Sequence, residues 1–393
     1  MDANKYGLGI YLDFQKAFDT VNHDILLHKL HHYGIRGNVL NWFKSYLTNR
    51  KQFTFINGTN SEVSQIDCGV PQGSVLGPLL FLVYVNDIQH AFANATPKLF
   101  ADDINVFLFQ SDIKTLFNLA NTELKSLNEW LLANKLSLSI GEGKDTKYTL
   151  FSPGKYPEVK QLPELHISGQ TVPYTPMIKY LGVFLDHKLS FKEHINLLCE
   201  KINKYIGVFY HIRHQLPEKC RRTLYFSFVF SYIYYCAEIY GNVPLSSLKP
   251  LQLIQNRVLR ALQYKNKYFP INEMHRDYEI LKIKDIVEYK QNKIIHSLLT
   301  GAKRLPVVLK KLIVPAKSIH QYRTRKKNSV YEVKPRRALG RRLLKCKASK
   351  NWNELPHDIT VQPSHGEFKT AFYDFKLSSY EESDLNFAPN MLS

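Results

Sequence analysis

The order of strand-like and helix-like segments in the first 151 residues most constrains how this chain folds. An apolar run at residues 7–14 predicts a buried strand, and the segments after it alternate between helical spacing and strand alternation. The strand-helix-strand-strand-helix-strand order is that of the split βαβ plan, so the sequence predicts an α+β fold. The segments are residues 7–14, 24–34, 38–48, 51–56, 62–68, 74–88, 98–109, 113–133, 136–140 and 147–151.

Three aspartates stand at the ends of two of these strands. Asp13 ends the first strand, and Asp102 and Asp103 lie in the turn of a predicted hairpin. If the two elements are neighbours in one sheet, three carboxylates meet, as two-metal phosphoryl transfer requires. The alternative is that aspartate pairs are common in turns for purely structural reasons. Asp24 fits better as the N-cap of the helix that follows it.

Charge is distributed unevenly along the chain. Residues 1–150 carry 13 Lys/Arg against 14 Asp/Glu, whereas residues 151–300 carry 21 against 12. Residues 301–350 carry 17 against 1, and residues 351–393 carry 2 against 7. A neutral first part followed by a strongly basic part predicts a functional site in the first part and a surface that binds a polyanion such as nucleic acid in the second. The alternative for residues 301–350 is a solvated, charged linker.

The five cysteines are scattered and form no C-x-x-C pair, which argues against a zinc knuckle and favours a reduced, intracellular setting. We therefore expect the nucleus or the cytoplasm. The longest apolar runs, near residues 75–85 and 224–237, are short for a bilayer span, so no membrane is expected as a partner.

Four short runs follow one another along the chain. They are YLDFQKAFD at 11–19, GVPQGSVLGP at 69–78, FADD at 100–103 and IKYLG at 178–182. In this order they resemble motifs A, B and C and the primer-grip turn of the reverse transcriptases of non-LTR (LINE-type) retrotransposons. Residues 255–257, 322–325 and 352–356 resemble the C-terminal half of the jockey-type polymerases, so the resemblance spans most of the chain.

The resemblance implies an RNA-directed DNA polymerase with two Mg²⁺ ions, for which Mn²⁺ is an alternative. Asp13, Asp102 and Asp103 would hold the metals, and the backbone carbonyl of Phe14 would join one of them. The partners implied are an RNA template, a DNA primer or target, and deoxynucleoside triphosphates.

The resemblance also implies contacts to the substrates. The ring of Phe18 would act as a steric gate against a ribose 2′-hydroxyl, with core packing as the alternative. Gln72 and Gly73 would contact the incoming nucleotide and the template, unless this loop is only a turn between a strand and a helix. The primer grip would consist of Tyr180, Leu181 and Gly182.

Two features depart from the family pattern. Near motif D a lysine usually precedes the position of Thr146, but Asp145 stands there. Lys144 is therefore the candidate general acid, and Lys147 is the alternative. The chain also begins only twelve residues before Asp13. We accordingly expect that the first strands of the fingers and an endonuclease domain are missing, which leaves Lys5, Arg50 and Lys51 as alternative triphosphate contacts.

Arginines beyond the motifs are candidates for contacts to the nucleic-acid backbone. They are interleaved with aromatic residues that can stack on unpaired bases. The arginines and lysines are Arg213, Arg221, Arg222, Arg257, Arg260, Arg323, Arg325, Lys326, Lys327, Arg336, Arg337, Arg341 and Arg342, and the aromatics are Tyr322, Tyr331 and Trp352.

These observations together predict a right-hand polymerase fold in three parts. Residues 1–190 would form a palm with partial fingers and the primer grip, residues 191–300 a helical thumb, and residues 301–393 a basic nucleic-acid-binding segment with an acidic tail. The main rival is a catalytically weak or inactive nucleic-acid-binding remnant of such an element. An RNA-dependent RNA polymerase is a second rival, against which Phe18 argues.

Overall fold

Two compact units make up the chain, each with a hydrophobic core of its own. The computed structural model describes residues 5–141, 143–152, 154, 157, 162–301, 305–316, 329–335 and 340–385. The first unit runs to Ile178 and the second begins at Lys179. The core of the second unit includes residues from Val183 to Phe372. The predicted α+β class is confirmed.

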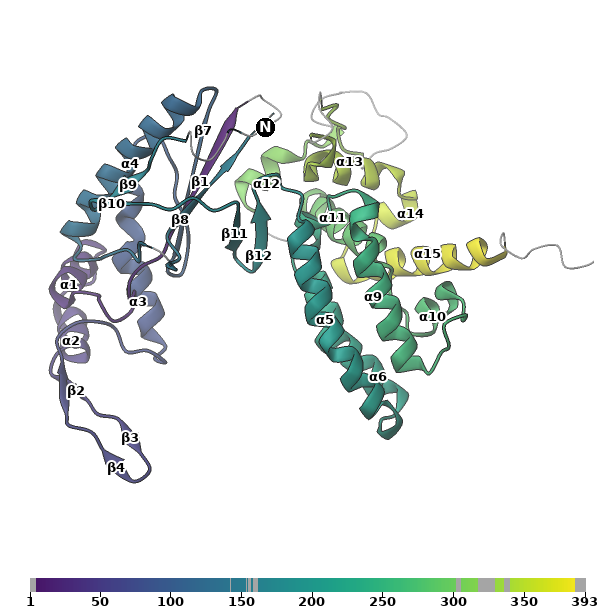
Figure 1. Cartoon of the computed structure of the whole chain (residues 1–393), viewed down its shortest axis with the longest axis horizontal. Coiled ribbons are helices and arrows are strands. Elements are labelled where there is room, and N and C mark those ends of the chain that lie inside the picture. Colours follow the sequence, from purple (N-terminus) through teal and green to yellow (C-terminus); the bar gives the residue numbers. More distant parts are fainter. Residues whose placement is uncertain are drawn as a thin grey trace, which may run out of the picture. The chain divides into compact units, whose positions relative to one another are not determined.

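A four-stranded antiparallel sheet forms the centre of the first unit, with strand order β6-β7-β1-β8 (Figure 1). The central strand is β1 (Tyr6–Leu12), whose last six residues are all buried. Its partners are β7 (Asp103–Gln110) and β8 (Lys147–Phe151), and β6 (Lys98–Phe100) lies at the edge. Burial on both faces explains why the sequence of β1 is apolar without alternation.

The helices of the first unit follow the predicted apolar spacing closely. They are α1 (His23–His32), α2 (Gly37–Leu47), α3 (Leu76–Val85) with the 3₁₀ turn η1 (Asn86–Ala91), and α4 (Ile113–Ala133). The prediction that Asp24 caps α1 is wrong. Asn22 is the cap, because its side chain accepts from the Ile25 N–H at 3.1 Å, and Asp24 lies in the first turn. There its charge favours the positive end of the helix dipole.

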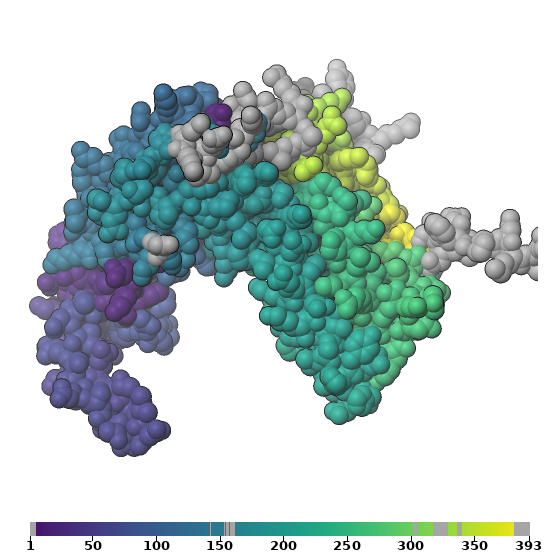
Figure 2. All heavy atoms as spheres, viewed as in Figure 1, coloured from purple at the N-terminus to yellow at the C-terminus, as the bar shows by residue number. Residues whose placement is uncertain are grey.

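The segments at residues 51–56 and 62–68 pair as a hairpin around Asn57-Gly58. It consists of β2 (Arg50–Gln52), β3 (Phe55–Ile56), β4 (Thr59–Asn60) and β5 (Ser64–Ile66), and it projects from the first unit as a narrow arm (Figure 2). Asn57 and Gly58 both have positive φ, 48° and 84°, which suits a two-residue hairpin turn. The strand predicted at residues 136–140 is wrong, since only a single bridge between Phe14 and Leu138 forms there.

Two small hairpins follow β8. The first pairs β9 (His166–Ile167) with β10 (Gln170–Thr171), and the second pairs β11 (Met177–Tyr180) with β12 (Val183–Asp186). Between β11 and β12 the chain turns at Leu181 and Gly182, whose φ angles are 44° and 81°.

The second unit is helical after β12. Its main helices are α5 (Lys192–Ile212), α6 (Glu218–Tyr225), α7 (Ser231–Tyr234), α8 (Ala237–Tyr240), α9 (Leu245–Gln263), α10 (Ile271–Asp277), α11 (Ile283–Thr300), α12 (Val307–Leu312), α13 (Leu344–Glu354), α14 (His357–Thr360) and α15 (His365–Leu385). Trp352, Phe368 and Phe372 from the C-terminal helices pack in the same core as α5, α9 and α11. Among the described residues, no helix has the length and apolar character needed to cross a bilayer.

Candidate active site

Asp13 follows the last residue of β1 and its backbone is held from both sides. The Asp13 N–H donates to Thr146 Oγ1 at 3.1 Å, and the Ser139 N–H donates to the Asp13 carbonyl at 2.8 Å. The segment that leads into β8 therefore fixes Asp13 at the end of the central strand. The Gln15 N–H donates to the Ser137 carbonyl at 2.9 Å. The backbone bridge between Phe14 and Leu138 therefore does not use the Phe14 carbonyl.

The β6–β7 hairpin brings Asp102 and Asp103 to the same end of the sheet. Its turn begins at Ala101, which has a φ of 53°. The register pairs Leu12 with Ile104, so the next position outward places Asp13 beside Asp103. The sheet thus places Asp13, Asp102 and Asp103 at one end of neighbouring strands.

Burial and neighbouring charges both act on the Asp13 carboxyl group. Burial is the main cause that raises the pKa of Asp13, and the charges of Asp145, Asp102 and Asp103 raise it further. Asp145 has the largest of these three charge effects, although the sequence identified it only as a departure from the motif D pattern. Nothing in its local sequence indicates this proximity, which arises because the Thr146 side chain is bonded to the Asp13 backbone.

The carboxylates fit a hard divalent cation in their chemistry. Within the described residues, no three His, Cys, Asp or Glu side chains are gathered closely enough to form a metal-binding group. Carboxylate oxygens are nevertheless the ligands that Mg²⁺ prefers, and the repulsion that raises the pKa of Asp13 is what a cation among these groups relieves.

The glycine-rich loop at residues 69–73 packs directly against the segment after Asp13. The Val70 N–H donates to the Phe18 carbonyl at 2.8 Å, and the Gly69 N–H donates to the Val21 carbonyl at 2.7 Å. A Cβ on Gly69 would lie 2.9 Å from the backbone of Asp19, so only glycine fits there. Backbone contact therefore couples the two segments.

Gln72 and Phe18 are each held by a neighbour. Gln72 is exposed, and its Nε2 donates to Asp19 Oδ1 at 2.8 Å. The half-buried ring of Phe18 packs on Phe81 of α3, with centroids 4.8 Å apart. Gly73 has a φ of 79°, and a Cβ there would meet nothing within 4 Å. The Gly73 position is therefore open to a ligand.

A cavity of about 730 Å³ lies beside this loop. Lys16, Arg50 and Lys51 line it together with Asp19 and Gln72. Lys16 was missed as a candidate by the sequence reasoning, since it lies within motif A but far in sequence from the other two cations. The cavity thus places three cationic side chains next to the loop predicted to contact a nucleotide.

Comparison with known proteins agrees with this geometry. Residues 1–185 match the family model described as reverse transcriptase (RNA-dependent DNA polymerase). The first 185 residues are a reverse transcriptase domain. The RNA-directed DNA polymerase from mobile element jockey of Drosophila funebris is 28% identical over 301 residues, which cover 72% of this chain and 31% of that protein.

Further relatives of the reverse transcriptase domain extend the match into the second unit. The probable RNA-directed DNA polymerase from transposon BS of Drosophila melanogaster is 26% identical over 345 residues, or 81% of this chain and 35% of that protein. The jockey polymerase of Drosophila melanogaster is 26% identical over 295 residues. The chain spans about a third of the length of these non-LTR retrotransposon relatives.

The lysines near motif D differ in their surroundings within the reverse transcriptase domain. Lys144 is exposed, in the turn before β8. Lys147 begins β8, pairs in register with Tyr11, and places its Nζ 3.9 Å from Asp145 Oδ1. Lys147 is therefore the lysine that pairs with a carboxylate. Lys144 remains the candidate general acid.

The predicted primer grip forms the β11–β12 turn. The Tyr235 hydroxyl donates to the Leu181 carbonyl at 2.6 Å, and a Cβ on Gly182 would lie 3.2 Å from the Tyr235 ring. The ring contact and the positive φ of 81° at Gly182 both favour glycine, and the hydrogen bond from Tyr235 holds the turn of Tyr180, Leu181 and Gly182 within the second unit.

Several arginines predicted to contact nucleic acid also donate hydrogen bonds to carbonyls of the second unit. Arg213 donates to the Ala261 carbonyl at 2.9 Å, Arg221 donates to the Leu262 carbonyl, and both guanidinium groups lie over the Tyr264 ring. Arg222 donates to the Tyr278 carbonyl at 2.8 Å. These three arginines satisfy carbonyls of the second unit. Tyr322, Arg323, Arg325, Lys326, Lys327, Arg336 and Arg337 lie outside the described residues.

Proposed function

We propose that this chain is the polymerase part of a non-LTR retrotransposon reverse transcriptase. The observation that carries the proposal is the convergence of Asp13 with the Asp102–Asp103 turn in a domain of that family. The reaction is attack of a primer 3′-hydroxyl on the α-phosphate of a deoxynucleoside triphosphate, directed by an RNA template. The place of action proposed is inside the cell, in the nucleus or the cytoplasm.

The carboxylates would act by holding metal ions in a fixed position. Two Mg²⁺ ions, or Mn²⁺ ions, would stabilise the attacking and the leaving oxygens when bound. Asp13, Asp102 and Asp103 would hold them, with the Phe14 carbonyl as a further ligand. The hydrogen bonds to the Asp13 backbone support this role, because a fixed ligand needs little reorganisation during the reaction.

The residues around the motif B loop would align the nucleotide. Asp19 holds Gln72, which would contact the nucleotide together with Gly73. The ring of Phe18 would exclude a 2′-hydroxyl, and its packing on Phe81 supports a rigid gate. The cavity cations Lys16, Arg50 and Lys51 would neutralise the triphosphate.

Two further roles complete the proposal. Lys144 would protonate the leaving pyrophosphate, with Lys147 as the alternative, and Tyr180, Leu181 and Gly182 would hold the primer. Residues 1–190 would then serve as the palm with partial fingers, residues 191–300 as the thumb, and residues 301–393 as a further contact to nucleic acid.

Extension of a DNA primer on an RNA template with Mg²⁺ tests the proposal. The parent chain should extend the primer, Asp102→Ala should abolish extension, and Asp374→Ala, an exposed aspartate on α15, should extend at the parent rate. Circular dichroism should show that all three proteins are folded. A folded Asp102→Ala variant that extends at the parent rate would refute the metal site.

The same assay separates the rival functions. A parent chain that binds primer–template and never extends it is the nucleic-acid-binding remnant of an element. A chain that prefers ribonucleotides is an RNA polymerase.

A further inference from the structure

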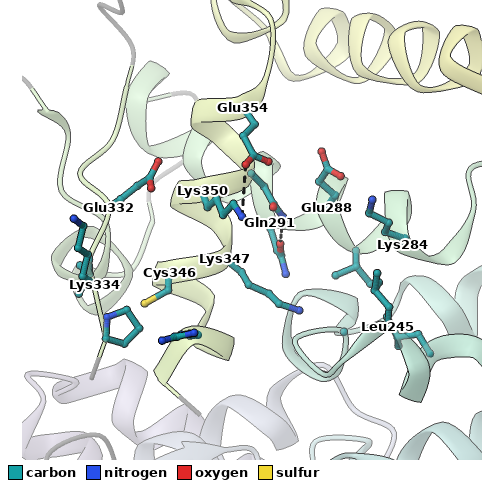
Figure 3. A pocket seen from close by; sticks show the side chains of 17 residues that line it. Leu245, Lys284, Glu288, Gln291, Glu332, Lys334, Cys346, Lys347, Lys350 and Glu354 are labelled. Atoms are coloured by element: carbon teal, nitrogen blue, oxygen red, sulfur yellow. Dashed lines mark hydrogen bonds and ion pairs between the residues drawn. The ribbon is translucent and has the colours of Figure 1, made fainter. Parts of the chain in front are cut away.

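A second cavity lies entirely within the second unit, and none of the residues proposed to hold the metal ions, the nucleotide or the primer lines it (Figure 3). Its volume is about 630 Å³, and its walls come from the start of α9, from α11, from α13 and from residues 332–335. Five cationic and three acidic side chains line it. They are Lys284, Lys334, Arg341, Lys347 and Lys350, and Glu288, Glu332 and Glu354.

The acids of this cavity are already engaged. Glu288 Oε1 lies 2.8 Å from the Nζ of Lys376, which is outside the cavity lining, and Glu354 Oε1 lies 3.7 Å from the Nζ of Lys350. Glu332 Oε1 accepts a hydrogen bond from Asn353 Nδ2 at 2.8 Å. In the described part of the chain, no carboxylate is within ion-pair distance of the remaining cations, Lys284, Lys334, Arg341 and Lys347. The cavity therefore carries an excess of positive charge.

Lys347 is the most constrained of these cations. It extends from α13 into the cavity (Figure 3), it is half-buried, and its Nζ donates to the Val243 carbonyl at 3.2 Å. Burial lowers the pKa of Lys347, and the charge of Arg342 lowers it further. An ammonium group has three N–H donors, so an anion in the cavity can accept a further hydrogen bond and supply the missing counter-charge.

The amides of the cavity wall are satisfied by one another. Gln291 Nε2 donates to Asn242 Oδ1 at 2.8 Å, and Asn351 Nδ2 donates to Gln291 Oε1 at 2.8 Å. Gln291 is fully buried. The cations therefore decide which ligand enters, and they favour an anion over a neutral polar group.

We propose that this cavity binds a phosphate group of a single-stranded polynucleotide. The four unpaired cations come from separate segments, α11, residues 332–335, the turn η6 (Gly340–Arg342) and α13, so they present charge from several sides. Three of them belong to residues 301–350, which carry 17 Lys/Arg against 1 acid. Arg342 and Lys345, which neighbour these cations along the chain, add positive charge that a polynucleotide can use and a single free phosphate cannot. The proposal rests on the contact to nucleic acid proposed above for residues 301–393 and not on the polymerase reaction itself.

Fluorescence anisotropy of the full chain with a labelled single-stranded RNA, without Mg²⁺ or nucleotides, tests this site. Lys347→Gln combined with Lys284→Gln should weaken binding about tenfold or more, since each removes a charge-assisted hydrogen bond. It should also reduce the log–log salt slope by about 0.7 for each phosphate that the variant no longer binds. Lys347→Arg keeps the charge and should retain most of the affinity.

Lys249→Gln on α9 is the matched control, because it removes an exposed lysine of the same unit that does not line the cavity. It should leave the affinity within about twofold, as expected for one screened surface charge. Sodium phosphate serves as the competitor that represents a free anion. Equal RNA affinity of the parent and the double variant would overturn the proposal. It would also be overturned if sodium phosphate abolished RNA binding at a concentration where a phosphate-free salt of the same ionic strength had no effect.

Discussion

Replacing Gly69 with alanine tests whether backbone contact between the motif A and motif B segments builds the active site. Gly69 has a φ of 90°, and a Cβ there would lie 2.9 Å from the Asp19 Cα and carbonyl oxygen. The positive φ costs a residue with a side chain about 1–2 kcal/mol. The steric overlap is with backbone, which cannot rotate away, and adds about 1–3 kcal/mol. The first unit should therefore lose roughly 2–5 kcal/mol of unfolding free energy.

Gly58→Ala is the matched control for this substitution. Gly58 has a φ of 84°, but a Cβ there would meet nothing within 4 Å. The control therefore carries the conformational cost without the overlap, and the difference between the two variants isolates the contact with Asp19. Urea unfolding followed by circular dichroism measures the loss of stability, and hydrogen–deuterium exchange of β1 and β7 assigns it to the first unit.

The same substitution should also affect the reaction. A shift of Asp19 moves the acceptor of the Gln72 side chain, so primer extension should show a higher nucleotide KM in Gly69→Ala than in Gly58→Ala. If both variants lose the same stability and keep the same KM, the packing of the two segments does not align the nucleotide.

Three further predictions concern the reverse transcriptase domain. Phe18→Ala should raise the kcat/KM for ribonucleotides relative to deoxynucleotides by about tenfold or more, and an unchanged ratio in a folded variant would make Phe18 a packing residue only. Asp145→Asn removes one of the charges that raise the pKa of Asp13, so the pKa of Asp13 should fall and the acidic limb of the extension–pH profile should move to lower pH; a limb that stays in place contradicts the coupling. Arg50→Gln with Lys51→Gln should raise the nucleotide KM about tenfold or more without a matching fall in kcat, and a loss confined to kcat would show that neither side chain binds the triphosphate.

The sequence by itself determined those features that depend on residues close along the chain. Apolar spacing gave the helix at residues 113–133 with its bounds, and Asn57-Gly58 gave the hairpin turn, because positive φ at both positions is a local requirement. The order of the motifs indicated the three carboxylates before their positions were known. Local chemistry sufficed there, since each motif is a short run with a characteristic composition.

Only the tertiary structure decided which distant groups meet. Asp145 affects Asp13 because Thr146 is hydrogen-bonded to the Asp13 backbone across 133 residues. Arg213 and Arg221 bind carbonyls at the end of α9, which their own sequence surroundings do not reveal. The charge of a side chain is set by its type, but its partner is set by packing over long range. A sequence can therefore show that a cation is present without showing whether the fold or a ligand uses it.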